Sequence, residues 1–84
     1  MGSTEQTIDI PAELEKNVCG HMDVNLHKIE RTLQVTMIER DGSVKVMGEE
    51  SKVQKAISVF TNLVALTRRG ETISEQTVNY ALSL

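Results

Sequence analysis

The chain of 84 residues is long enough for one domain and too short for two independent hydrophobic cores. Hydrophobic residues make up 39% and charged residues 25%, which is ordinary globular usage and excludes disorder along the whole chain. Nine basic and twelve acidic side chains give a net charge of −3, so general nucleic-acid coating is excluded and phosphate binding would need a local site. The single cysteine, Cys19, excludes an internal disulfide and fits a reducing compartment. We expect one cytoplasmic domain with no signal peptide or membrane span.

The chain opens with a polar segment and a short strand. Residues 1–6 are small and polar, which indicates a flexible N-terminus. Thr7–Ile10 then alternates polar and apolar residues, the pattern of a half-buried strand. Pro11 ends this strand because proline lacks the N–H that a β ladder needs, and it suits the first turn of a helix. A helix is predicted over residues 12–19.

A second helix follows after a very short connection. Gly20 is the residue expected to end the first helix in a left-handed conformation. Apolar residues at helical spacing predict the second helix from residue 23 or 24 to residue 33, with Asp23 as its N-cap. The connection is therefore only about Gly20–Met22.

The middle of the chain predicts a β-hairpin. The runs 35–40 and 43–47 are rich in β-branched residues and are separated by Asp41-Gly42. This dipeptide favours a two-residue type I′ turn, in which both central residues need positive φ.

The last part of the chain predicts a long helix and a shorter one. Ser51 and Gln54 have capping-box spacing near the start of the long helix, although a start one or two residues earlier is also compatible with the sequence, and Gly70 follows its end. Ser74 is the expected N-cap of the last helix, over residues 75–84.

The order β-α-α-β-β-α, followed by one more helix, is that of a type I KH domain. The resemblance implies an α+β fold whose three-stranded antiparallel sheet has its third strand in the centre and carries the helices on one face. The residues expected in the core are apolar and lie on the inward side of each predicted element. They are Ile8, Leu14, Val18, Leu26, Ile29, Leu33, Val35, Val44, Val46, Val53, Ala56, Ile57, Phe60, Leu63 and Val64.

Two further segments narrow the resemblance. Cys-Gly-x-x-Asp-x-x-Leu-x-x-Ile-Glu at Cys19–Glu30 and Gly-Glu-Thr-Ile-Ser at Gly70–Ser74 resemble the N-terminal region of PhoH-like proteins, bacterial proteins associated with phosphate starvation. That family carries a KH-like module ahead of a P-loop ATPase domain. The resemblance implies a KH-like module over residues 7–70 and, over residues 71–84, a helix that leads toward an ATPase domain. No G-x-x-x-x-G-K-[ST] motif occurs in this chain, so ATP and Mg²⁺ are expected only in that other domain, and this chain has no expected cofactor.

The turn between the first two helices is the candidate binding site. In KH domains a Gly-x-x-Gly loop lets a nucleic-acid backbone approach closely. The resemblance therefore assigns Gly20, His21, Met22, Asp23 and Lys28 to RNA-backbone binding, with Leu26, Ile29 and Val35–Met37 along the base-facing wall. Here Asp23 replaces the second glycine, and its charge and its capping role both oppose phosphate. Residues 1–30 carry six acidic and two basic side chains, whereas residues 31–84 carry six and seven, so the half that should hold phosphate is the more acidic one.

Catalytic and metal sites receive little support. Cys19, His21, Asp23 and His27 are metal-ligating residue types, but the spacing of Cys19 and His21 is too tight for a usual zinc site and no second cluster follows. No base accompanies Cys19 as a nucleophile, so this chain is expected to be no enzyme.

Two functions remain open from the sequence. The first is a noncatalytic accessory module that binds or positions single-stranded RNA for the ATPase domain. The second is a protein-interaction or oligomerisation module that contacts the ATPase domain or another copy of the chain. No membrane partner is expected.

Overall fold

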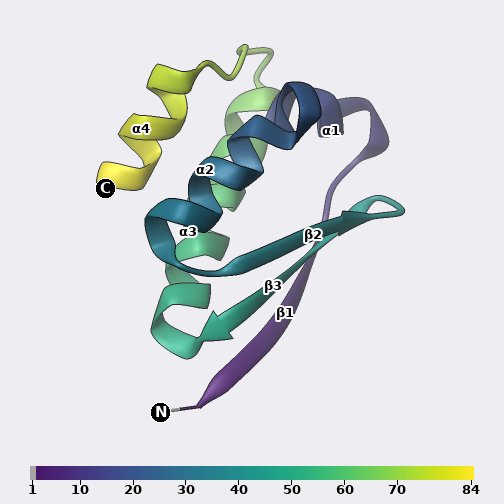
Figure 1. Ribbon diagram of the computed structural model, residues 1–84. Helices are drawn as coiled ribbons and strands as arrows, with labels where there is room; N and C mark the ends of the chain where they lie inside the picture. Colours follow the sequence, from purple (N-terminus) through teal and green to yellow (C-terminus); the bar gives the residue numbers. More distant parts are fainter. Residues whose placement is uncertain (1) are drawn as a thin grey trace.

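The computed structural model describes residues 2–84 and shows the predicted order of elements (Figure 1). The strands are β1 (Ser3–Asp9), β2 (Thr36–Arg40) and β3 (Ser43–Glu49), and the helices are α1 (Ala12–Cys19), the 3₁₀ turn η1 (His21–Asp23), α2 (Val24–Leu33), α3 (Glu50–Arg68) and α4 (Glu75–Ser83). No helix within these described residues is both long and apolar enough to cross a membrane.

The strands form an antiparallel sheet in the order β1-β3-β2, which confirms that the third strand lies in the centre. Ile8 pairs with Val44, and Met37 pairs with Val46. The hairpin is also confirmed: Asp41 has a φ of 53° and Gly42 a φ of 80°, as a type I′ turn requires.

Strand β1 is longer than its sequence pattern predicts. It begins at Ser3, which pairs with Glu49, so residues 3–6 lie in the sheet rather than in a flexible terminus. These four residues are all polar and their side chains are mostly exposed, so the sequence lacks the alternation of polar and apolar residues that marks a half-buried strand. Backbone hydrogen bonds to the long central strand hold them there, and such bonds leave no trace in side-chain periodicity.

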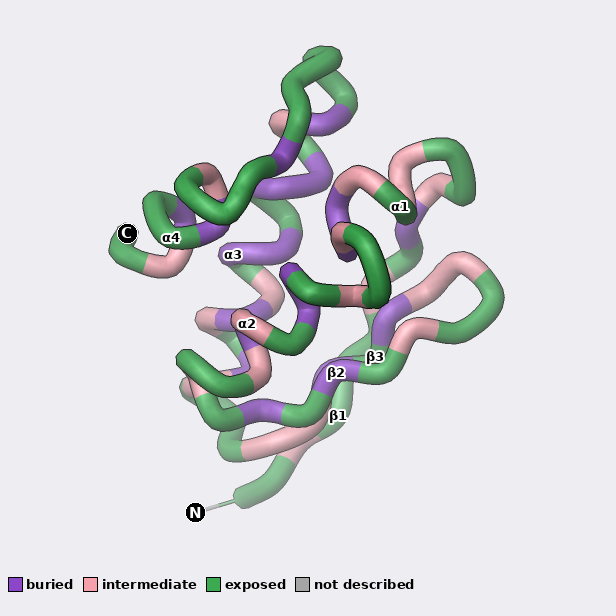
Figure 2. Tube along the Cα trace, turned by 45° about the horizontal axis from the view of Figure 1, so that its top comes forward, coloured by how far each residue is buried: buried purple, intermediate pink, exposed green. Residues whose placement is uncertain are grey.

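The helices cover one face of the sheet, and the core lies between the two layers (Figure 2). Most of the predicted core is buried, and Val44, Val46, Val53, Phe60 and Leu63 are fully inaccessible. Four predicted core residues at the rim of the core are only partly buried: Ile8, Leu14, Leu33 and Ile57. The buried hydrophobic residues absent from the predicted core are Ile10, Cys19, Met37, Val59, Ile73, Val78 and Ala81.

Helix α4 is part of the module. It packs on α2 and α3, and Val78 and Ala81 are buried against them. The segment before α4 is held by Asn17 on α1, whose amide donates to the Glu71 carbonyl at 2.9 Å and accepts from the Ile73 N–H at 3.0 Å. The α4 N-cap is the predicted Ser74, which forms a capping box with Thr77.

The N-cap of α3 lies two residues before Ser51, which is the earlier start that the sequence left open. Glu49, and not Ser51, is the N-cap residue, and its carboxylate accepts hydrogen bonds from the N–H groups of Ser51 at 2.7 Å and Lys52 at 3.3 Å. The Ser51 hydroxyl also donates to this carboxylate. That bond has the largest effect, and together with the two N–H bonds it lowers the pKa of Glu49 below its ordinary value. A carboxylate at this end of a helix also complements the helix dipole, so it competes well with a serine two residues later.

Candidate functional site

The turn between α1 and α2 is tightly constrained at its first residue. Gly20 has a φ of 83°, and a Cβ placed on it would lie 2.9 Å from Cγ1 of Val24. Only glycine fits both this backbone conformation and this close approach. Behind the turn, the buried Asn25 side chain donates a hydrogen bond to the Val18 carbonyl at 2.9 Å and ties α2 to the end of α1.

The middle of the turn is presented to solvent. His21 and Met22 are exposed, and 80% of the Met22 surface remains accessible. Met22 and Asp23 both adopt left-handed conformations, with φ of 53° and 58°. Such strain in non-glycine residues is more common at functional positions than elsewhere.

The predicted capping role of Asp23 is wrong. Asp23 occupies the N-cap position of α2, but within residues 2–84 its side chain accepts no capping hydrogen bond. A capping side chain reaches the free amides of the first turn from an extended backbone, and Asp23 is left-handed instead. Its carboxylate therefore stays available to act on its surroundings as a charge.

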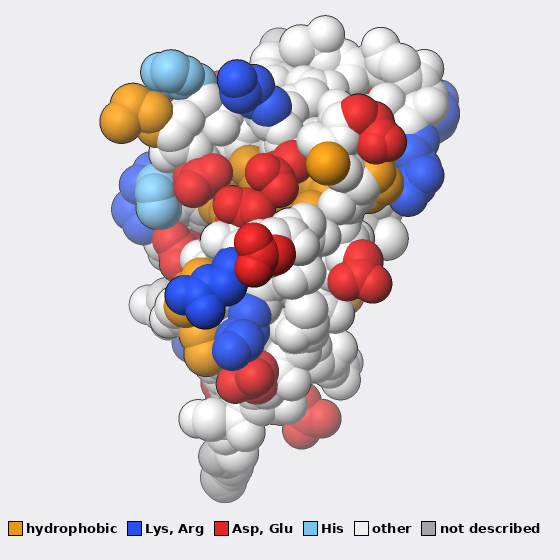
Figure 3. All heavy atoms as spheres, turned by 90° about the vertical axis from the view of Figure 1, so that its right-hand side faces the viewer, with side chains coloured by type: hydrophobic (Ala, Val, Ile, Leu, Met, Phe, Trp, Pro, Cys, Tyr) orange, Lys and Arg blue, Asp and Glu red, His pale blue; other side chains and the backbone are white. Residues whose placement is uncertain are grey.

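Carboxylates gather on the side of α2 that faces α1 and the hairpin. A hydrogen bond with Glu15 raises the pKa of Glu39 above its ordinary value, and partial desolvation and the charges of Glu15 and Asp23 raise it further, against one backbone hydrogen bond that lowers it. Burial raises the pKa of the Cys19 thiol to about 12, and the charges of Asp23, Glu15 and Glu39 add to this effect. Figure 3 shows acidic side chains concentrated in the centre of this face.

Glu30 extends this acidic surface to the sheet edge. Its carboxylate accepts a hydrogen bond from the Met37 N–H of the edge strand β2 at 2.7 Å, and it lies 2.9 Å from Nδ1 of His27. We refer to Glu15, Asp23, Glu30 and Glu39 together as the acidic side of α2. One N–H of the β2 edge is thus already occupied by a carboxylate.

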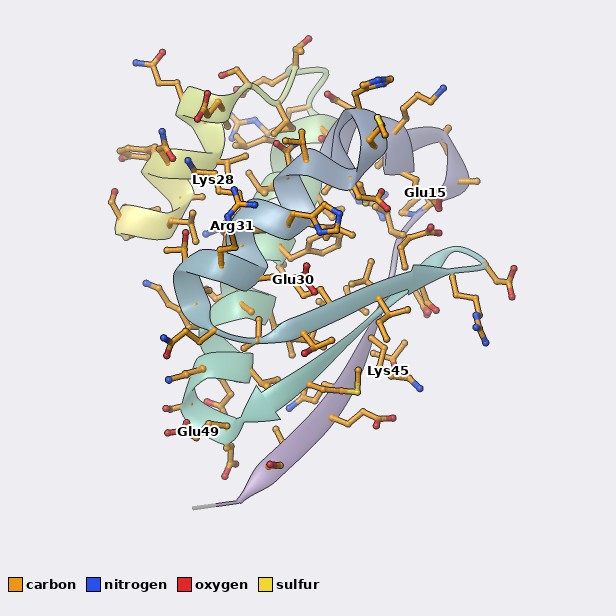
Figure 4. All side chains as sticks on the ribbon, viewed as in Figure 1. Glu15, Lys28, Glu30, Arg31, Lys45 and Glu49 are labelled. Carbon is orange, nitrogen blue, oxygen red and sulfur yellow. The ribbon has the colours of Figure 1, made fainter. Side chains whose placement is uncertain are left out.

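The other side of α2 is cationic and faces α4. Figure 4 shows Lys28 and Arg31 on this side, whereas Glu30 points toward β2. Lys28 forms an ion pair with Glu75 of α4 at 3.4 Å. Both cations line a concavity of about 320 Å³, which we call the α2–α4 concavity. Its lining includes Gly20, His21, Val24, Lys28, Arg31 and Ile73.

The structure thus divides the predicted site residues. Gly20, His21 and Lys28 line the α2–α4 concavity, whereas Met22 lies outside its lining and Asp23 contributes to the acidic side. Four further charged residues border these surfaces and were not predicted from the sequence: Glu15, Glu39, Arg31 and Glu75. The spacing of Lys28 and Arg31, three residues apart on a helix, could have indicated a shared face. Glu15 and Glu39 come together only through tertiary packing.

The chemistry available in these surroundings is limited. Cys19 is 2% exposed and its raised pKa keeps the thiol protonated, so it is a poor nucleophile. Among the described residues, no group of three or more His, Cys, Asp or Glu side chains has an arrangement that could hold a metal ion.

The sheet order β1-β3-β2, the helices on one face and the glycine turn between α1 and α2 define a type I KH-like module. Comparison with known proteins confirms the narrower resemblance as well. The chain is 30% identical over 78 residues, 93% of its length, to PhoH-like proteins of Mycobacterium tuberculosis and Mycobacterium bovis. It is 34% identical over 65 residues to the PhoH-like protein of Bacillus subtilis, which covers 77% of the chain.

The match covers nearly all of this chain but only 22% of the mycobacterial relatives and 20% of the Bacillus relative. The chain is therefore similar to one segment of these PhoH-like relatives and spans about a fifth of their length. No family model matches it.

Proposed function

We propose that this chain is a noncatalytic accessory module of a PhoH-like protein and that it acts through protein contacts rather than by holding RNA in a KH groove. The observation that carries this proposal is the acidic side of α2. Glu15, Asp23 and Glu39 lie close enough to shift the pKa of neighbouring groups. The resemblance to KH domains assigns Asp23 to the nucleic-acid backbone and Val35–Met37 to the base-facing wall, so nucleic acid bound in a KH groove would lie on this side.

Charge and hydrogen bonding both disfavour nucleic acid on the acidic side of α2. A phosphate backbone placed beside these carboxylates would meet like charges, which disfavours binding, most strongly at low salt. The Met37 N–H on β2 already donates to Glu30, so a nucleobase at this edge would have to displace a charge-assisted hydrogen bond. A protein partner carries no phosphate backbone and need not use this edge, so it meets neither cost.

ATP binding and hydrolysis, with Mg²⁺, are assigned in this proposal to the remainder of the PhoH-like protein. The chain has no P-loop motif. Its own part is to position that remainder or a partner of it.

Single-stranded RNA is the second candidate, and the exposed turn favours it. His21 and Met22 project from the place that the Gly-x-x-Gly loop occupies in KH domains. Asp23→Gly would restore the second glycine and remove one negative charge. If RNA is the ligand, this variant binds it more tightly at low salt, and added salt weakens the binding.

A paired binding assay separates the two candidates. The labelled chain is titrated with the separately produced remainder of the Mycobacterium tuberculosis PhoH-like protein, with that protein's own matched segment as a positive control. A second titration uses a single-stranded octauridine with the chain and with Asp23→Gly. We expect the protein contact and no RNA binding by the unmodified chain. RNA binding by the unmodified chain, or binding of the relative's segment but not of this chain, would contradict the proposal.

A further inference from the structure

We propose that the α2–α4 concavity is a docking site for an acidic, partly apolar segment of a protein partner. This inference rests on the proposed function, because it names the chemistry of the contact through which the module would act. It concerns the side of α2 opposite to the acidic side.

The shape and the lining of the concavity suit a short peptide segment. Its volume of about 320 Å³ is enough for a few side chains and too small for an extended surface. Ile73 is almost fully buried and forms an apolar part of the lining, while Val24 keeps 54% of its surface exposed. An exposed apolar side chain beside a concavity favours a partner that brings apolar groups of its own.

The charges of the concavity define the polar part of the partner. Lys28 and Arg31 lie one helical turn apart and both line it. Arg31 belongs to no ion pair found among residues 2–84, whereas Lys28 is held by Glu75. Two neighbouring cations attract carboxylates, and the planar Arg31 guanidinium can bind a carboxylate with two parallel hydrogen bonds.

The chain itself already places a carboxylate in this position. Glu75 of α4 lies 3.4 Å from Nζ of Lys28, and its side chain remains 80% exposed. An exposed ion pair of this kind contributes little to stability, so a partner's carboxylate can replace Glu75 at small cost. Glu75 therefore acts as a weak internal competitor for the same cation.

A protein segment fits this site better than a nucleic acid does. A phosphate backbone gains its affinity from many cations along a path, and this concavity offers Lys28 and Arg31 with Glu75 between α2 and α4. The chain also carries a net charge of −3. Isolated carboxylates that alternate with apolar side chains match both the small number of cations and the apolar lining.

The test follows amide chemical shifts of the ¹⁵N-labelled chain at low salt with three probes. They are an acetylated octapeptide of alternating glutamate and leucine, the same peptide with glutamine for glutamate, and octauridine. We expect the glutamate peptide to shift amides of residues 20–31 and 73–75 and to bind more tightly than the glutamine peptide. No binding of the glutamate peptide, shifts confined to other surfaces, or tighter binding of octauridine at these residues would overturn the proposal.

Variants of exposed or partly exposed residues locate the contact. Lys28→Gln and Arg31→Gln should each lower the affinity for the glutamate peptide roughly three- to tenfold. Glu75→Gln should raise this affinity about two- to fivefold, because it frees Lys28. Lys45→Gln on β3 is the matched control, because it removes the same charge far from the concavity and should leave the affinity unchanged (Figure 4). Equal effects of Lys45→Gln and Arg31→Gln would overturn the assignment to this site.

Failure of the docking site and failure of the accessory role give different results. If the remainder of the PhoH-like protein binds the chain but Lys28→Gln and Arg31→Gln do not weaken that contact, the docking site is wrong and the accessory role stands. If the peptide binds as expected and the remainder does not, the docking site stands and the accessory role is wrong.

Discussion

The two sides of α2 differ in charge although both border the same helix of ten residues. Toward β2 and α1, Asp23 lies near Glu15 and Glu39, and these carboxylates raise the pKa values of Glu39 and Cys19, while Glu30 accepts a hydrogen bond from the Met37 N–H of β2. Toward α4, Lys28 and Arg31 line a concavity and one of them is paired with Glu75. A KH-like fold can therefore keep its glycine turn while carboxylates on the side expected to hold a phosphate backbone repel phosphate. The fold alone does not establish the ligand.

The largest effect is expected at Gly20, where the two sides of α2 begin. Gly20→Ala should lower the free energy of unfolding by about 2–4 kcal/mol, because it combines strain at positive φ with a clash against Val24. Gly70→Ala is the matched control: Gly70 has a φ of 87° and open space around it. This control should cost only about 1 kcal/mol. Denaturant unfolding measures both, and equal losses would show that the close approach at Gly20 is unimportant.

The next effect concerns α4, which bounds the cationic side. Val78→Ala removes a fully buried side chain between α4 and its neighbours and should cost about 1.5–3 kcal/mol. Tyr80→Ala on the same helix removes a side chain that is 67% exposed and should change stability by no more than about 0.5 kcal/mol. If Val78→Ala is as mild as Tyr80→Ala in thermal or denaturant unfolding, α4 is not docked and the concavity lacks one wall.

A smaller effect is expected in the pH dependence of the acidic side. The folded-state pKa of Glu39 is raised, so the protonated carboxyl favours the folded state below the unfolded-state pKa, and this contribution is lost as pH rises through the folded-state pKa. Glu39→Gln should remove this loss, and the variant should gain stability relative to the unmodified chain on the neutral side of that window. Unfolding curves from pH 3 to pH 7 provide the measurement. If the stability of the variant depends on pH in the same way as that of the unmodified chain, Glu39 does not interact with the other carboxylates of the acidic side of α2.

The opposite sign is expected at Glu49, which lies on neither side of α2. Its pKa is lowered by the Ser51 hydroxyl and by amides of the α3 N-terminus, so its contribution is present above the unfolded-state pKa and is lost as pH falls through the folded-state pKa. Glu49→Gln should therefore reduce stability at neutral pH and have little effect in acid. The same series of unfolding curves should show the two variants diverging in opposite directions.

The parts of the structure that local rules govern were predictable from the sequence. The Asp41-Gly42 turn needs two adjacent residues with positive φ, and the Ser74 cap needs a hydroxyl before a helix. Helix α3 was predictable because its apolar residues recur at helical spacing. The order of these elements then led to the KH-like resemblance, because few folds share it.

The parts that depend on tertiary packing were not predictable in this way. Residues 3–6 join β1 through backbone pairing with β3, which side-chain patterns do not record. Asp23 looks like a cap in sequence, but its left-handed backbone prevents that role. The meeting of Glu15 with Glu39, and of Lys28 with Glu75, joins residues far apart in the chain. The division of α2 into an acidic and a cationic side therefore appears only in the folded structure.

The central claim is that the acidic side of α2 does not hold a nucleic-acid backbone. The most direct measurement is an amide shift map of the ¹⁵N-labelled chain titrated with single-stranded octauridine at low salt, where phosphate contacts are strongest. We predict no shifts at His21–Asp23 or Thr36–Ile38. Saturable shifts at these residues that diminish as salt is added would contradict the account and would place RNA in the KH groove.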